Sequence, residues 1–201
     1  GGGGFTGIEM VGELVEWVED LCIDYKVDCK EVSLMVVEAR PKILPTMSDS
    51  LIEKAALYLK KKGVKLYTDS PITEVAADFV TLKSGEIINT KSMIWTGGIK
   101  ANGLVGCLGL KTSGRGHVVV NEFMQTSDPA IYAIGDNACF IDKDGSPMPA
   151  LVESAIQSGQ AAARNIAAKI TGKPQKELKL NLHGHMVSIG AEYCIADTMG
   201  L

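Results

Sequence analysis

The first nine residues, GGGGFTGIE, constrain the fold of this chain more than any other stretch. Gly2, Gly4 and Gly7 have the spacing G-x-G-x-x-G, typical of a dinucleotide-binding turn. The first glycine permits a tight turn, the second lets a pyrophosphate approach the backbone, and the third lets a helix pack closely. Such a turn normally follows a hydrophobic strand, whereas these glycines have none in front of them. We therefore expect the chain to be a fragment that lacks this first strand.

The residues after the glycines predict a parallel α/β arrangement. Apolar residues recur at helical spacing over 7–26 and predict an amphipathic helix. The nearly continuous apolar run at 32–38 is typical of a strand buried on both faces. The capping-box spacing of Ser50 and Glu53 predicts the start of a second helix, which we expect to end at Gly63. Together these segments predict a Rossmann-like unit.

A small antiparallel meander is predicted inside this unit, and a different module after it. Strands are predicted at 64–68, 72–75, 79–82 and 86–89, with a hairpin turn at 83–85. Farther along, 117–120 and 131–136 predict strands, 150–170 predicts a helix, and 179–197 alternates like a hairpin. The predicted fold class is α/β.

Composition excludes several kinds of partner and site. The net charge of -4 offers no basic surface for a nucleic-acid backbone. No apolar run approaches the roughly 18 residues of a spanning helix, and we expect a cytoplasmic location. The 5 cysteines show no C-x-x-C spacing, so we expect buried free thiols. His183 and His185 would share one strand face, but they have no matching carboxylate or thiol, so we expect half-buried, hydrogen-bonded histidines and no metal site.

Acidic residues near the predicted turn indicate which dinucleotide would bind. Glu38 ends the first predicted strand, where a carboxylate can accept hydrogen bonds from an adenosine ribose. Its charge would repel the 2′-phosphate of NADPH, which favours NADH. Arg40 could pair with such a phosphate, although a solvated charge beside Pro41 is the simpler interpretation. Glu9 falls in the first turn of the predicted helix, where the helix dipole alone explains a carboxylate.

A second ligand signal lies in TSDPAIYAIGD. An apolar strand that ends in Gly135 and Asp136 would place a carboxylate at the carboxyl end of a strand, where ligands of open α/β sheets bind. A plain turn from strand to loop would give the same pattern.

Five stretches together resemble one family. GGGGFTGIE, VVEA, PKILPTMSDSL, IWTGG and AIYAIGD, in this order, resemble the C-terminal half of a type II NADH dehydrogenase. Members of that family are flavoproteins that pass electrons from NADH through FAD to a quinone, with an NADH domain inserted in the FAD domain. The resemblance implies an NADH-binding Rossmann-like domain at 1–112, part of an FAD-binding domain at 113–178, and the start of a C-terminal hairpin region at 179–201.

The resemblance also implies roles for particular residues. Those implied to contact NADH are Gly2, Gly4, Gly7, Glu9 and Glu38, with Thr96, Gly97 and Gly98 near the domain junction. Asp136, after Gly135, would hold the ribityl and pyrophosphate part of FAD. Where the family usually has A-Q-x-x-x-Q near the flavin and quinone, this chain has VESAIQ, so Gln157 matches and Glu153 replaces a glutamine. Glu9, Glu153 and Gln157 are thus the catalytic candidates.

Two alternatives remain open. One is an NADH oxidase, ferredoxin reductase or disulfide reductase of the same superfamily, and the other is a nucleotide-binding module without turnover. We expect the fragment to be inactive alone, because the first FAD fingerprint lies in the family's N-terminal half. Exposed sheet edges predict a homo-oligomer. Contact with a membrane, at its cytoplasmic face, would come only through parent regions outside these residues.

Overall fold

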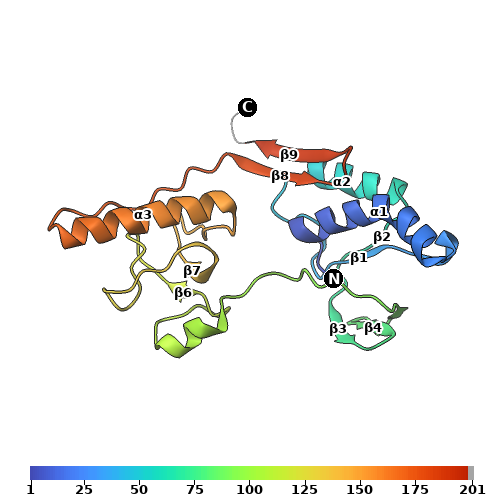
Figure 1. The fold of residues 1–201 in the computed structure, drawn as a ribbon, viewed down its shortest axis with the longest axis horizontal. Coiled ribbons are helices and arrows are strands. Elements are labelled where there is room, and N and C mark those ends of the chain that lie inside the picture. Colours follow the sequence, from blue (N-terminus) through green and yellow to red (C-terminus); the bar gives the residue numbers. More distant parts are fainter. Residues whose placement is uncertain (199–201) are drawn as a thin grey trace. The chain divides into compact units, whose positions relative to one another are not determined.

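The computed structural model describes residues 1–198 and forms two compact units. Unit 1 contains Gly1–Gly98 and the chain from His183 onward, and unit 2 is Ile99–Leu182. Both units contain helices and strands, which confirms the predicted α/β class (Figure 1). The assignment of 1–112, 113–178 and 179–201 to cofactor-binding domains stays a prediction.

Unit 1 is built on a β-α-β motif. β1 (Met35–Val37) and β2 (Lys65–Tyr67) are parallel and are joined by α2 (Asp49–Lys61). α1 (Phe5–Tyr25) and the short 3-10 helix η1 (Cys29–Glu31) precede this motif. The helices and strands predicted for this part of the chain are confirmed.

Neighbouring residues of β1 enter two different cores. Val36 packs with Ile8 of α1 and Ile52 of α2, whereas Val37 packs with Val80 and Ile88 of the meander. The meander is antiparallel and consists of β3 (Ile72–Val75), β4 (Phe79–Leu82) and β5 (Ile87–Asn89). Because successive side chains of a strand point to opposite faces, β1 is buried on both sides, as its apolar run predicts.

The predicted C-terminal hairpin is confirmed and belongs to unit 1. β8 (Gly184–Ser188) and β9 (Cys194–Thr198) pair antiparallel, and they contact α1 and α2 respectively (Figure 1). Val187 and Ile195 are buried in the same core as Ile8. The carboxylate of Glu16 on α1 also accepts a hydrogen bond from the Ala191 N–H at 3.0 Å. The two helices of unit 1 are therefore covered by the hairpin as well as by β1.

Two helix starts differ from the sequence prediction. α1 begins at Phe5, with Gly4 as its N-cap, so Glu9 lies in the second turn and the first turn holds no acidic residue. The dipole interpretation of Glu9 is wrong, since that effect falls off within the first turn. α2 begins at Asp49 with Ser48 as N-cap and no side-chain cap, so the Ser50 capping box is not formed.

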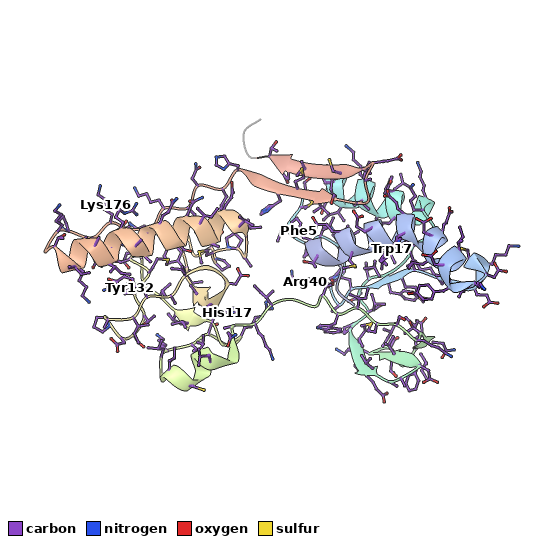
Figure 2. All side chains as sticks on the ribbon, viewed as in Figure 1. Phe5, Trp17, Arg40, His117, Tyr132 and Lys176 are labelled. Atoms are coloured by element: carbon purple, nitrogen blue, oxygen red, sulfur yellow. The ribbon has the colours of Figure 1, made fainter. Side chains whose placement is uncertain are left out.

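Unit 2 is organised around α3 (Val152–Ile170). Its other elements are η2 (Gly103–Leu108), β6 (Val118–Val119), η3 (Gly135–Asn137) and β7 (Ala138–Cys139), with β6 and β7 parallel. Ala161 and Ala162 of α3 pack into a core with Val118 and Phe140. The Tyr132 hydroxyl accepts hydrogen bonds from Gln125 and Gln175, which ties the loops beside α3 together (Figure 2).

The strand predicted at 131–136 is wrong. Tyr132 makes only an isolated bridge to Gln125, and the 3-10 turn η3 takes the end of the segment. Gly135 has a φ of 55°, outside the β region, and its N–H donates to the Ser158 hydroxyl of α3 at 3.0 Å. The Gly135 N–H is therefore bonded to a side chain of α3 and not to the backbone of a neighbouring strand.

The cysteine and histidine predictions are only partly correct. All five cysteines are unpaired, but Cys22 alone is buried, and Cys29, Cys107 and Cys194 are exposed. A hydrogen bond with Cys22 raises the pKa of the Cys29 thiol to about 11. The buried Nδ1 of His185 has no hydrogen-bond partner, contrary to expectation. Across residues 1–198, no helix is long and apolar enough to cross a membrane.

Candidate functional site

The glycine loop and the first turn of α1 form one continuous backbone surface in unit 1. The Ile8 N–H makes the first intrahelical bond, to the Gly4 carbonyl at 3.0 Å. The N–H groups of Phe5, Thr6 and Gly7 therefore come before the helical hydrogen-bond ladder begins. With the positive end of the helix dipole, such groups favour a negatively charged ligand.

The three fingerprint glycines have different surroundings. Gly2 has a φ of 107°, and a Cβ there would lie 2.7 Å from the Thr96 carbonyl oxygen. A Cβ on Gly7 would collide with the Gly2 carbonyl oxygen. Gly4 has nothing within 4 Å of its Cβ position. The first and third glycines are thus required by packing, and the second faces open space from which a ligand can reach the backbone.

Thr96, which is followed by Gly97 and Gly98, lies against this loop. The Thr96 N–H donates to the Gly1 carbonyl at 2.7 Å, and its hydroxyl donates to the Gly1 and Gly2 carbonyls at 3.1 Å. A Cβ on Gly97 would be 2.7 Å from the Trp95 ring, whereas Gly98 has a φ of 104° and open space around it. The structure therefore brings Thr96, which begins the predicted 96–98 cluster, against the glycine loop, although the two lie far apart in the sequence.

Glu38 connects the loop to the end of β1. It is 9% exposed, and its Oε2 accepts a hydrogen bond from the Gly3 N–H at 2.6 Å. Its Oε1 accepts from the Arg40 N–H at 2.8 Å. Because a carboxylate oxygen has more than one acceptor site, Glu38 can still accept bonds from a ligand hydroxyl. The carboxylate of Glu38 thus stabilises the glycine loop and can also bind a ligand.

Two other predicted residues lie at the margin of this site. Glu9 is half-buried on α1, one turn beyond the free N–H groups. Arg40 is exposed (Figure 2), and its carbonyl accepts a hydrogen bond from the Asp69 N–H at 2.8 Å. The backbone of Arg40 is therefore fixed while its side chain reaches solvent.

Unit 2 contains a separate cavity of about 300 Å³ beside η3. Gly135 and Asp136 line it together with Arg115, His117 and the segment Pro147–Ala150. Asp136 is exposed, and the Cβ position of Gly135 would contact Ala155 of α3 at 3.5 Å. The cavity can therefore hold a polar ligand that carries hydroxyl groups for Asp136 and a negative charge for Arg115.

Gln157 makes two bonds that were not predicted. Its Nε2 donates to the Asn181 carbonyl at 2.8 Å, and its Oε1 accepts from the Asn181 N–H at 2.9 Å. Glu153, one turn earlier on α3, is half-buried. Gln157 thus holds the chain after α3 in position, which the sequence pattern alone does not reveal.

Sequence reasoning also missed the residues that complete these sites. Arg115 and His117 lie in the loop GRGH. The one sequence signal for a ligand there is a pair of basic side chains next to glycines. Ser158, which holds Gly135, is fully buried and carries no sequence signal of its role. Within residues 1–198, no group of three or more His, Cys, Asp or Glu side chains could hold a metal ion.

Comparison with known proteins identifies the chain's relatives. The model of the pyridine nucleotide-disulphide oxidoreductase family matches residues 2–159. The type II NADH:quinone oxidoreductase of Staphylococcus aureus is 32% identical over 207 residues, covering 100% of this chain and 51% of that protein. The enzyme of the same name from Staphylococcus epidermidis is 34% identical, covering 95% of this chain and 48% of that protein. This chain therefore spans about half the length of the curated relatives it matches.

A solved structure gives the same fold. NDH2 from Plasmodium falciparum in complex with NADH has a TM-score of 0.83, covering 100% of this chain and 57% of that one. Its sequence identity is 14%, so this likeness concerns the fold alone. The predicted resemblance to type II NADH dehydrogenases is confirmed by the relatives.

Proposed function

The chain belongs to the pyridine nucleotide-disulphide oxidoreductase family, and on that premise we propose that it is the NADH-binding part, with a portion of the FAD-binding part, of an NADH:quinone oxidoreductase. One observation carries the proposal: three features meet at the glycine loop. They are the open space at the Cβ position of Gly4, the N–H groups of the first turn of α1, and the buried carboxylate of Glu38. The names of the Staphylococcus relatives support the same activity.

In unit 1, the pyrophosphate of NADH would lie over Gly4. The N–H groups of Phe5 and Thr6 would donate to its oxygens, and the helix dipole would stabilise its charge. Glu38 would accept hydrogen bonds from the adenosine ribose and would repel a 2′-phosphate. Because Glu38 is already held by Gly3 and Arg40, little ordering would be needed when the ribose binds.

In unit 2, the cavity beside η3 would hold part of FAD. Asp136 can accept from ribityl hydroxyl groups, Gly135 lines the cavity without a side chain, and Arg115 can pair with a phosphate. Bound FAD would supply the two-electron chemistry that links NADH to a quinone. The residues that line the cavity therefore match the chemistry of the proposed cofactor.

Three side chains are proposed to act near the reacting groups. Glu9 would lie beside the nicotinamide, at the end of α1 that faces the loop. Glu153 would lie at the flavin and quinone, where the family usually has glutamine. Gln157 would act as a positioning residue, since both ends of its amide hold Asn181.

The test uses the product of the complete reading frame that encodes this chain. Its visible spectrum and its oxidation of NADH and NADPH with a soluble quinone analogue are measured. We expect a flavin spectrum, quinone reduction and a preference for NADH. Bound flavin without quinone reduction would contradict the quinone assignment and would favour an oxidase or a ferredoxin-linked reductase. Absence of flavin would leave only a nucleotide-binding module.

The variant Glu153→Gln sharpens this test, because it restores the family's usual residue. We expect it to change the KM for the quinone analogue and to leave the KM for NADH unchanged. An equal change in both constants would contradict a role for Glu153 at the quinone.

A further inference from the structure

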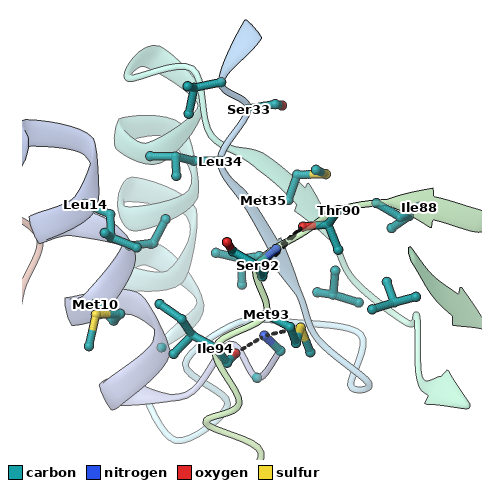
Figure 3. Close-up of a pocket in the computed structure, with 18 residues that line it drawn as sticks. Met10, Leu14, Ser33, Leu34, Met35, Ile88, Thr90, Ser92, Met93 and Ile94 are labelled. Atoms are coloured by element: carbon teal, nitrogen blue, oxygen red, sulfur yellow. Dashed lines mark hydrogen bonds between the residues drawn. The ribbon is translucent and has the colours of Figure 1, made fainter. Parts of the chain in front are cut away.

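A pocket beside β1 in unit 1 and a hollow beside α3 in unit 2 differ in the charge of their lining. The pocket beside β1 is lined by apolar and small polar residues (Figure 3), and none of the described residues that line it has a charged side chain. The hollow in unit 2 has a volume of about 460 Å³ and is lined by Arg164, Lys176, Glu177 and Lys179. The lining of the hollow therefore favours an anion.

The hollow lies in a basic stretch of a chain whose net charge is -4. Residues 161–182 contain one acidic residue, Glu177, and five basic residues, which are Arg164, Lys169, Lys173, Lys176 and Lys179. All five basic side chains are exposed, so their charges attract anions from solution. The positive charge of this stretch is local and is not apparent from the net charge of the chain.

Glu177 is paired with a cation that does not line the hollow. Its Oε2 accepts a hydrogen bond from the Lys143 ammonium at 2.6 Å. This bond and the charge of Lys143 lower the pKa of the Glu177 carboxyl, and the charge of Lys179 lowers it further. Within residues 1–198, Arg164, Lys176 and Lys179 form no salt bridge or side-chain hydrogen bond. These three cations are thus available to a ligand.

The backbone that carries the two lysines is held by buried groups. Asn165 is fully buried, and its Oδ1 accepts a hydrogen bond from the Lys176 N–H at 2.9 Å. Its Nδ2 donates to the Lys176 carbonyl, also at 2.9 Å. Leu178 is buried as well, and its N–H donates to the Glu122 carbonyl at 2.7 Å. Lys176 is therefore fixed beside the turn of α3 that carries Arg164 (Figure 2).

Three like charges around one hollow repel one another, and a bound anion offsets that repulsion. A guanidinium can donate two parallel hydrogen bonds to one phosphate group, and an ammonium can donate to further oxygens. We propose that the hollow binds a small soluble ligand with two or three linked phosphate groups, held by Arg164, Lys176 and Lys179. Three positive charges match such a ligand more closely than a single phosphate group, which carries a charge of about -2.

The hollow is separate from the two sites proposed for dinucleotides. Arg164 lies about 18 Å along α3 from Val152, where the helix starts. None of the residues that line the hollow lines the cavity beside η3, and the glycine loop belongs to unit 1. The inference therefore does not depend on the proposed function.

Titration of the 201-residue chain with inorganic tripolyphosphate, at about 0.02 M salt to limit screening, tests this proposal. Binding is followed by the amide NMR signals of Glu177 and Leu178, which lie between the two lysines. The test variant combines Arg164→Gln, Lys176→Gln and Lys179→Gln, and its Tm should change little because these side chains are exposed. We expect its Kd to be at least about tenfold higher than that of the unchanged chain. Equal affinity of the two proteins would overturn the proposal.

A matched control separates the hollow from general attraction of the anion. Lys60→Gln, Lys61→Gln and Lys62→Gln together remove the same charge from an exposed run at the end of α2. We expect the Kd measured at the same two amide signals to change by less than about twofold. A rise equal to that in the test variant would overturn the proposal. So would binding of inorganic phosphate as tight as that of tripolyphosphate, because linked phosphate groups would then have no advantage.

A lipid surface with phosphate-bearing headgroups offers the same chemistry and is tested separately. The unchanged chain and the test variant are sedimented with vesicles of phosphatidylglycerol and phosphatidylcholine. We expect the two proteins to sediment to the same extent. Vesicle binding that the test variant loses and that tripolyphosphate does not compete would overturn the proposal, because the hollow would then belong to a lipid-facing surface.

Discussion

Glu38 in unit 1 and Asp136 in unit 2 both follow apolar runs in the sequence, but their surroundings differ. Glu38 is 9% exposed and accepts backbone hydrogen bonds from Gly3 and Arg40, whereas Asp136 is exposed at the start of a 3-10 turn. A buried carboxylate that is already hydrogen-bonded supports the fold and can also bind a ligand. An exposed carboxylate can bind a ligand without supporting the fold. Substitution of Glu38 should therefore reduce the stability of the fold, whereas substitution of Asp136 should not.

The largest effect is expected from Gly7→Ala in unit 1. The new Cβ would collide with the Gly2 carbonyl oxygen, which Thr96 holds in place. We expect a loss of about 2–4 kcal/mol in the free energy of unfolding, despite the higher helix propensity of alanine. NADH binding, followed by fluorescence titration, should be lost as well.

Gly4→Ala is the matched control for Gly7→Ala. Its Cβ would meet no atom within 4 Å, so the cost in stability should be about 1 kcal/mol or less, as for an altered N-cap. The new methyl group would nevertheless stand where the pyrophosphate is proposed to lie. We expect the Kd for NADH to rise at least about tenfold. Unchanged binding would show that Gly4 does not face the ligand.

Glu38→Gln should have the next largest effect. One of the two backbone N–H groups would face an amide NH₂ in place of an oxygen, at an expected cost of about 1–3 kcal/mol in denaturant unfolding. The ratio of the Kd for NADPH to that for NADH should fall, since the repelling charge is gone. Arg40→Met is the control, because only the backbone N–H of Arg40 bonds Glu38. A large effect of Arg40→Met on NADPH binding would contradict the role given to Glu38.

Gln157→Ala in unit 2 should have a smaller effect. It removes both bonds to the Asn181 backbone, and we expect a loss of about 1–2 kcal/mol in thermal unfolding. Gln160→Ala on the same helix is the control, because Gln160 is exposed. Similar losses in the two variants would argue against a positioning role for Gln157.

The smallest effect on stability is expected from Asp136→Asn. Because the side chain is exposed, the free energy of unfolding should change by no more than about 0.5 kcal/mol. In the product of the complete reading frame, the same change should weaken retention of FAD, measured by the flavin absorbance that survives gel filtration. A large loss of stability would remove the contrast between Glu38 and Asp136.

Local sequence patterns predict those parts of the fold that local physics decides. The helical spacing at 7–26 and the apolar run at 32–38 correspond to α1 and β1, because each pattern matches the faces that the element buries. The turn glycines are also predictable from local physics. Gly63 and Gly85 have φ values of 83° and 89°, which glycine adopts more readily than other residues.

The parts of the fold that sequence patterns do not predict depend on contacts between residues that are distant in the chain. The segment 131–136 is apolar enough for a strand, but the Ser158 hydroxyl on α3 takes the N–H of Gly135. The bonds from Gln157 to Asn181 and from Thr96 to Gly1 also join residues far apart in the chain. In the candidate site of unit 1, the glycines and Glu38 follow from a motif. In the separate cavity of unit 2, Arg115 and His117 lie in a loop without periodicity.

Calorimetric titration of the 201-residue chain with NADH and with NADPH tests the central claim most directly. If the glycine loop, the first turn of α1 and Glu38 form a prepared dinucleotide site, NADH should bind with one-to-one stoichiometry and at least about tenfold more tightly than NADPH. Binding of NADH should also weaken in Gly4→Ala. Absence of saturable NADH binding by the folded chain, or equal affinity for the two dinucleotides, would contradict this account.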